Sequence, residues 1–237
     1  MEKLQKLFGK SWTEELLPFL RSEEFEKIGN QIKQFQIKRL EITPAPKEIF
    51  RSFLECPFHK MHTLILANGP YIGKAEEDGG LIADGLAFSA RRAKNTPTAL
   101  HLLTEAMNEE IYNNDPEQSM LGWDNDLTYL ANDGVLLLNT GLTATIGRAS
   151  TEHISIWKPF ISFVLKLINS KKDSMGVILM GDYAKSYHPL LDNPTYAVYE
   201  CEHPNEAIMR NKRWDSDGCF KALNAYHKTF NNINIKW

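Results

Sequence analysis

LILANGPYIGKAEEDGGLIADGLAF (residues 64–88) begins as a short apolar run and ends at an aromatic residue, Phe88, after a glycine-rich loop. The run has the length of a strand that is buried on both faces, and Gly69-Pro70 ends it. The loop carries three adjacent carboxylates. The stretch therefore predicts a buried strand whose carboxyl end delivers a polar loop.

Three similar apolar runs follow, at residues 134–139 (GVLLLN), 176–181 (GVILMG) and 195–201 (TYAVYEC). Helical patterns lie between them, most clearly at 98–112 and 157–170. Strands that alternate with helices favour a parallel sheet covered on both sides. We predict one α/β domain over residues 1–237, a three-layer sandwich with a central, mostly parallel four-stranded sheet flanked by helices. Ahead of the sheet, Ser11 with Glu14 three residues on predicts the start of an amphipathic helix.

Composition narrows the function classes. A net charge of −3 argues against a histone-like DNA binder, although Arg and Lys cluster locally at 91–94 and 210–213. We expect no membrane span and no secretory signal, and hence a cytoplasmic protein of bacterial type. Three cysteines without CxxC spacing predict neither a disulfide framework nor a zinc site, and the pair His59 and His62 has no companions that would make a metal site. We expect no cofactor.

The ends of the predicted strands carry the polar residues. They read Asn68-Gly69-Pro70-Tyr71, Asn139-Thr140-Gly141, Gly181-Asp182-Tyr183 and Glu202-His203-Pro204. Ligand sites of parallel sheets lie at the carboxyl ends of the strands, so these residues are expected to converge on one crevice.

The order of these pieces carries a resemblance. ANGPYIG, GLAFS, LANDGVLLLNTGLT, GDYAK and EHP, in that sequence, resemble the landmarks of the uracil-DNA glycosylase superfamily, most of all the common family 1 enzymes. SWTEELLPFL, ITPAPKEIF and the closing INIKW extend the likeness to nearly the whole chain. The resemblance implies a monomeric, monofunctional DNA glycosylase that flips a nucleotide out of double-stranded DNA, hydrolyses its N-glycosidic bond and leaves an abasic site.

The resemblance also implies roles for individual residues. Phe88 would stack on the flipped base, Asn139 would read its polar edge and Tyr71 would wall the pocket beside the pyrimidine C5. His203 would donate to the base oxygen where negative charge develops. Residues implied to contact DNA, by pinching phosphates or by filling the vacated stack, are Thr96, Pro97, Thr98, Gly181, Tyr183, Lys185, Pro204, Asn205, Ile208, Met209 and Arg210.

The chain departs from the family at its water-activating loop. Gly69 stands where the family has its catalytic aspartate, and Asn68 is a candidate to hold the attacking water through its carbonyl oxygen. A relocated acid is the alternative, either Asp84 or one of the loop carboxylates Glu76, Glu77 and Asp78.

The segment between Tyr71 and Phe88 is also longer than in the family. A longer loop with carboxylates, which accept hydrogen bonds from hydroxyl groups, favours a pyrimidine with a bulky polar 5-substituent, such as glucosylated hydroxymethylcytosine in phage DNA, and a role in antiviral defence. Two alternatives stay open: an inactive glycosylase fold that binds DNA or protein, and a uracil-DNA glycosylase with altered water activation.

Overall fold

The computed structural model describes residues 1–75, 79–115 and 124–237. Glu76, Glu77 and Asp78, which we considered as ligand-binding carboxylates, lie outside the described residues.

The centre of the molecule is a four-stranded sheet in the order β3-β2-β5-β6, and all neighbouring strands run parallel. The strands are β2 (Thr63–Ala67), β3 (Val135–Asn139), β5 (Gly176–Met180) and β6 (Ala197–Cys201). Each coincides with one of the four apolar runs. A separate antiparallel pair, β1 (Ile42–Thr43) with β4 (Ala144–Thr145), was not expected.

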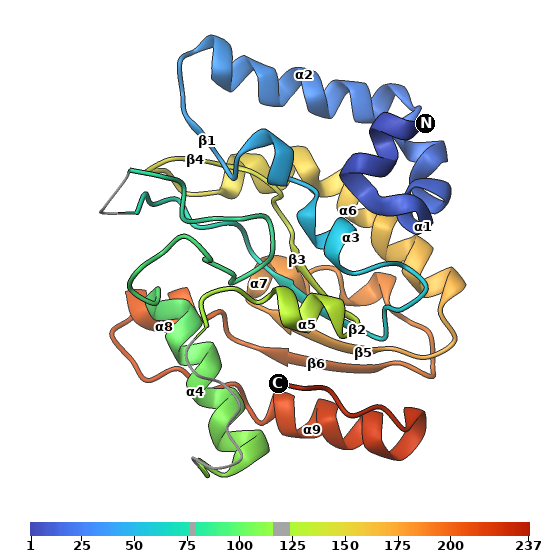
Figure 1. The fold of residues 1–237 in the computed structure, drawn as a ribbon, viewed down its shortest axis with the longest axis vertical. Coiled ribbons are helices and arrows are strands. Elements are labelled where there is room, and N and C mark those ends of the chain that lie inside the picture. Colours follow the sequence, from blue (N-terminus) through green and yellow to red (C-terminus); the bar gives the residue numbers. More distant parts are fainter. Residues whose placement is uncertain (76–78, 116–123) are drawn as a thin grey trace.

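Helices cover both faces of the sheet, which confirms the three-layer architecture (Figure 1). On one side lie α1 (Glu2–Leu20), α2 (Glu23–Ile37), α3 (Arg51–Glu55) and α6 (Thr151–Lys171), and on the other α4 (Thr98–Tyr112), α8 (Pro204–Met209) and α9 (Cys219–Tyr226). Shorter elements complete the chain: α5 (Thr128–Asn132), α7 (Asp182–Lys185), two 3₁₀ turns (Pro46–Glu48 and His188–Leu190) and a π-helical turn (His227–Asn231).

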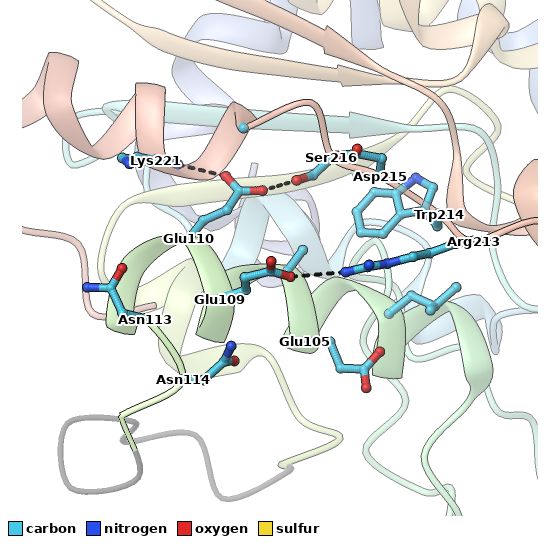
Figure 2. A pocket seen from close by; sticks show the side chains of 13 residues that line it. Glu105, Glu109, Glu110, Asn113, Asn114, Arg213, Trp214, Asp215, Ser216 and Lys221 are labelled. Carbon is cyan, nitrogen blue, oxygen red and sulfur yellow. Dashed lines mark hydrogen bonds and ion pairs between the residues drawn. The ribbon is translucent and has the colours of Figure 1, made fainter.

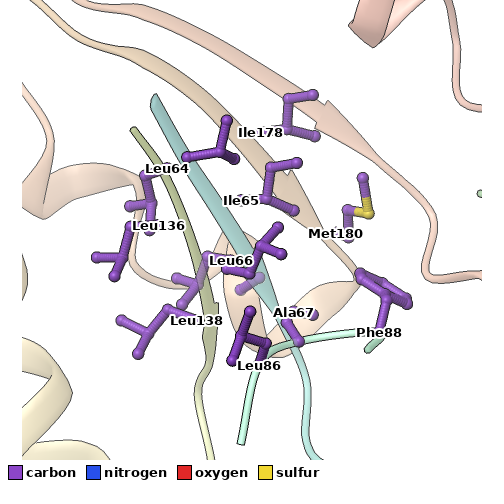
Figure 3. Packing of buried hydrophobic residues seen from close by; sticks show 14 of the residues in the cluster. Leu64, Ile65, Leu66, Ala67, Leu86, Phe88, Leu136, Leu138, Ile178 and Met180 are labelled. Carbon is purple, nitrogen blue, oxygen red and sulfur yellow. The ribbon is translucent and has the colours of Figure 1, made fainter. Parts of the chain in front are cut away.

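The sheet forms the core because three of its four strands, β2, β3 and β5, are apolar on both faces. Every residue of β2, β3 and β5 is buried, and burying each large aliphatic side chain contributes about 1.5–3 kcal/mol. Figure 3 shows leucines and isoleucines of these strands packed together, with Leu86 and Phe88 closing the carboxyl end of the sheet. The aromatic end of the 64–88 stretch is therefore anchored to the strand that begins it.

Two local predictions need correction. The helix start predicted at Ser11 is displaced, because α1 begins at Glu2 and is broken at Gly9, where φ is +70°, so that its second part begins directly after Gly9. The Ser11 hydroxyl accepts instead from the backbone N–H of Phe58. The pair His59 and His62 was expected in a surface loop, but the His62 ring bonds the Asp133 carbonyl and the Thr63 hydroxyl.

The three cysteines, Cys56, Cys201 and Cys219, are free and buried. In residues 1–75, 79–115 and 124–237, no helix combines the length and apolar character needed to cross a membrane, and no group of acidic, histidine and cysteine side chains is arranged to hold a metal ion.

Candidate active site

The pairing of β2 with β3 brings two asparagines to the same edge of the sheet. Ala67 lies opposite Asn139 in the ladder, so Asn68 follows directly beside it. The connection is fixed by backbone bonds, with the Thr140 N–H on the Ala67 carbonyl at 2.8 Å and the Gly141 N–H on the Asn68 carbonyl at 3.0 Å. The predicted convergence of strand ends is therefore present for β2 and β3.

Asn139 has the character of a ligand-reading side chain. It is 5% exposed, and its Oδ1 is buried without a hydrogen-bond partner among the described residues. An unpaired buried acceptor costs about 1–3 kcal/mol. A ligand N–H that reached this oxygen would remove that cost.

His203 is held as a neutral donor. It precedes α8 as the N-cap, and its Nδ1 accepts from the Asn205 N–H at 3.1 Å. Burial lowers the pKa of His203 to about 4, so the ring is neutral at pH 7. Because Nδ1 acts as an acceptor, the single ring proton lies on Nε2.

Phe88 lies against this histidine. Their ring centroids are 5.3 Å apart and the planes differ by 25°, an offset stack. Phe88 has a φ of +64°, a rare conformation for an aromatic residue that is found at constrained sites. The Tyr71 hydroxyl fixes it by donating to the Phe88 carbonyl at 2.9 Å, and burial raises the pKa of Tyr71.

The position of the missing aspartate is filled from another element. A Cβ atom placed on Gly69 would lie 2.7 Å from the Ser150 Oγ and 2.9 Å from the Ser150 Cβ, closer than non-bonded atoms approach. Ser150 immediately precedes α6. Gly69 is therefore required by its neighbour, and any larger residue would displace the serine.

Asn68 points away from that serine, toward β5 and β6. Its amide packs against Gly181, where an added Cβ would lie 2.8 Å from Nδ2 and 3.0 Å from Oδ1. Nδ2 donates to the Glu206 Oε1 at 3.3 Å, and Oδ1 is buried without a partner among the described residues. Neither Glu206 nor Ser150 was singled out from the sequence. Glu206 did carry one signal, since it is a carboxylate three residues after His203.

Asp84 does not reach the crevice as a ligand-binding or water-activating acid. It is fully buried and its oxygens accept from the Leu86 N–H, the Ser89 hydroxyl and the Arg91 N–H. Arg51 pairs with it at 3.1 Å. Its acceptor capacity is used to fold the loop that carries Phe88, so that prediction was wrong.

The long loop forms one side of a separate cavity. Lys74 and Leu81 make an antiparallel bridge, and the Ile82 N–H bonds the Gly73 carbonyl. Facing residues 92–98, the loop encloses about 310 Å³, which is within the range of small-ligand sites, about 300–1,000 Å³. The lining among the described residues is Lys74, Ala75, Ile82, Arg92, Ala93, Lys94, Asn95, Thr96, Pro97 and Thr98, and the charged members of this set are cationic.

The residues predicted to contact DNA lie on three segments around the strand ends. Thr96–Thr98 lead into α4, Gly181 and the residues after it form α7, and Pro204–Arg210 form α8 and its end. Of the two predicted wedge residues, Met209 is 78% exposed and Ile208 is 39% exposed. Arg210 is exposed but pairs with Glu202 at 2.7 Å.

A larger cavity, of about 940 Å³, lies between α4 and residues 213–221 (Figure 2). Its lining includes several carboxylates, which disfavour DNA. Glu110 crosses it to accept from the Ser216 hydroxyl and the Lys221 N–H. This cavity includes none of the residues predicted for the active site.

The comparisons with known proteins agree with this geometry. No protein-family model matches the chain. It is 32% identical over 227 residues to a uracil-DNA glycosylase of Streptococcus thermophilus, covering 96% of this chain and 97% of that protein. A uracil-DNA glycosylase of Borrelia turicatae is 30% identical over 226 residues, covering 95% and 96%. The crystal structure of mimivirus uracil-DNA glycosylase superposes with a TM-score of 0.86 at 19% identity, covering 99% of this chain and 88% of that one. The chain thus belongs to the uracil-DNA glycosylase family, and it is a DNA glycosylase.

Proposed function

We propose that the protein flips a pyrimidine nucleotide out of duplex DNA and hydrolyses the bond between the base and C1′ of the sugar. The observations that carry this proposal are a buried, neutral donor and a buried, unpaired acceptor, each near the carboxyl end of a strand of the same parallel sheet. His203 carries its ring proton on Nε2 and can donate it in a hydrogen bond. The Asn139 Oδ1 is an acceptor that has no donor among the described residues.

The reaction follows from that arrangement. The C1′–N bond breaks with its electron pair leaving on the base, and the oxygen of a water molecule bonds to C1′. The water supplies one proton to the departing base and the remaining hydroxyl to the sugar, so one water is consumed. A neutral N–H donor that the protein holds in place stabilises the negative charge that develops on the leaving base. The donor does not have to reorient during the reaction, because its position is already fixed.

Asn139 accounts for pyrimidine recognition. Its free Oδ1 accepts an N–H from the base edge, which both uracil-like and cytosine-like pyrimidines offer. Phe88 and His203, whose nearly buried rings stack on each other, would form an aromatic wall for the base.

The substrate that we propose is a pyrimidine with a bulky polar 5-substituent, such as glucosylated hydroxymethylcytosine. The support is the long segment between Tyr71 and Phe88, which forms one side of the cavity of about 310 Å³. That cavity offers threonine, asparagine and cationic side chains as partners for a sugar. Such bases occur in hypermodified phage DNA, so removing them would serve antiviral defence.

Uracil is the alternative substrate. The relatives from Streptococcus thermophilus and Borrelia turicatae are named uracil-DNA glycosylases. In addition, Tyr71 is fixed by its bond to the Phe88 carbonyl, and a tyrosine held beside C5 would favour a base without a large substituent there.

The test compares duplex DNA that carries one uracil, one hydroxymethylcytosine or one glucosylated hydroxymethylcytosine. Released base is identified by mass spectrometry and abasic sites by alkaline strand cleavage. Release of the glucosylated base supports the proposal, and release of uracil alone shows that the alternative is right. No release from any DNA that the protein binds would leave only the inactive binding module.

A further inference from the structure

We propose that Glu206 is a positioning residue: it holds the amide of Asn68 so that the Asn68 Oδ1 accepts a hydrogen bond from the attacking water. The inference rests on the proposed function and assigns to Asn68 and Glu206 the task of the family's aspartate. It joins two elements that are distant in the sequence, the end of β2 and the first turn of α8.

The two ends of the Asn68 amide differ in their hydrogen-bond partners. Nδ2 is engaged by the Glu206 Oε1 at 3.3 Å, whereas Oδ1 has no donor among the described residues. An ionised carboxylate only accepts hydrogen bonds, so it selects the NH₂ end of the amide. The carbonyl end is thereby left to accept a proton from a water molecule.

The side chain and the backbone of Asn68 are both held in place by their neighbours. The Asn68 side chain lies on Gly181, which leaves no space for a Cβ atom. Gly181 has a φ of +89°, so glycine is favoured there twice over. The Asn68 backbone is also fixed, because its carbonyl accepts from the Thr140 hydroxyl at 2.6 Å and from the Gly141 N–H.

Glu206 lies on the same helical turn as His203. It follows His203 by three residues, and the first turn of α8 carries both side chains. Glu206 in that turn would ordinarily bond the backbone N–H of the N-cap residue. Here its carboxylate bonds Asn68 instead, so one turn of helix positions the leaving-group donor and orients the water acceptor.

Single-turnover kinetics at saturating DNA test the proposal. Glu206→Ala should lower the rate about 100-fold, the scale of a misplaced catalytic group, and to the level of Asn68→Ala. Glu206→Gln retains an acceptor for Nδ2 and should keep at least a third of the parent rate. The double variant should be no slower than Asn68→Ala alone, because both changes remove one unit.

The control is Glu152→Ala, which removes an exposed carboxylate from the first turn of α6 without touching Asn68. It should leave the rate unchanged, so a general charge effect on DNA binding is separated from positioning. An unchanged rate in Glu206→Ala, a double variant slower by the product of the single effects, or a loss in Glu206→Gln as large as in Glu206→Ala would overturn the proposal.

A second measurement needs no catalysis, and so distinguishes failure of this inference from failure of the proposed function. The side-chain ¹⁵N–H resonances of Asn68, assigned with Asn68→Ala, should shift in Glu206→Ala and stay in place in Glu152→Ala. Resonances that do not respond to Glu206→Ala would show that the hydrogen bond is absent, whatever DNA the protein acts on.

Discussion

Burial of His203 predicts a measurable loss of stability in mild acid. The folded protein holds the pKa of His203 near 4, whereas an unfolded histidine has a pKa of about 6.5. The unfolded chain therefore binds the proton more readily, and the stability that depends on the neutral ring is lost as the pH falls from about 6.5 toward 4. For one such histidine, the free energy of unfolding should fall by about 2 kcal/mol between pH 7 and pH 5.

The variant His203→Asn isolates this contribution. Asparagine is a good N-cap and retains an acceptor for the Asn205 N–H, so α8 keeps its first turn. We expect the variant to lose about 2 kcal/mol less than the parent between pH 7 and pH 5. Any constant cost of the smaller side chain cancels in this difference.

Urea unfolding at pH 7 and pH 5, followed by tryptophan fluorescence, measures these free energies. The variant should still lose stability in acid, since burial also lowers the pKa of His227 to about 4. The control His59→Asn changes an exposed histidine and should behave as the parent does. If His203→Asn and the parent lose the same stability between the two pH values, His203 does not titrate as a buried neutral ring, and the tautomer argument fails.

Three further predictions concern the site. Gly69→Asp should destabilise the fold by about 1–3 kcal/mol, the cost of overpacking, and should not restore the family's chemistry. In urea unfolding, the double variant with Ser150→Gly should recover most of the lost stability. A Gly69→Asp variant as stable as the parent would contradict the close contact with Ser150. Asn139→Leu should lower the rate of base release by about 100-fold or more. It should not lower the thermal stability, because the substitution removes an unpaired buried acceptor. A large fall in melting temperature would show that the Asn139 Oδ1 has a partner in the folded protein. Met209→Ala should raise the KM for duplex DNA several-fold and hardly change the KM for single-stranded DNA. The free energy of unfolding should change by less than about 0.5 kcal/mol. Equal effects on both DNAs, or a larger effect of Ile208→Ala, would show that Met209 is not the residue that fills the vacated stack.

The sheet was predictable because its signal is local. Each strand is a short apolar run, and parallel pairing follows from the helical patterns between the runs. Asn139 and His203 could be placed at the strand ends for the same reason, and the resemblance to a family gave them roles.

The supporting residues were not predictable, because their function depends on contacts across long stretches of sequence. Asp84 follows the loop glycines and was the alternative candidate for an acid in the crevice, yet it pairs with Arg51 in the core. Glu206 was overlooked because its partner, Asn68, is 138 residues away. In such cases side-chain chemistry is visible in the sequence, but the direction in which the side chain points is set by tertiary packing.

The contact between Ser150 and Gly69 has an evolutionary consequence. An aspartate at position 69 is accommodated only after the serine has become smaller, and a smaller residue at 150 alone leaves a gap without the benefit of a carboxylate. Each single step away from the present pair is therefore unfavourable, whereas the two steps together are not. While the serine fills this space, an aspartate at position 69 requires a change at both positions. A laboratory selection for the aspartate would have to randomise both positions at once.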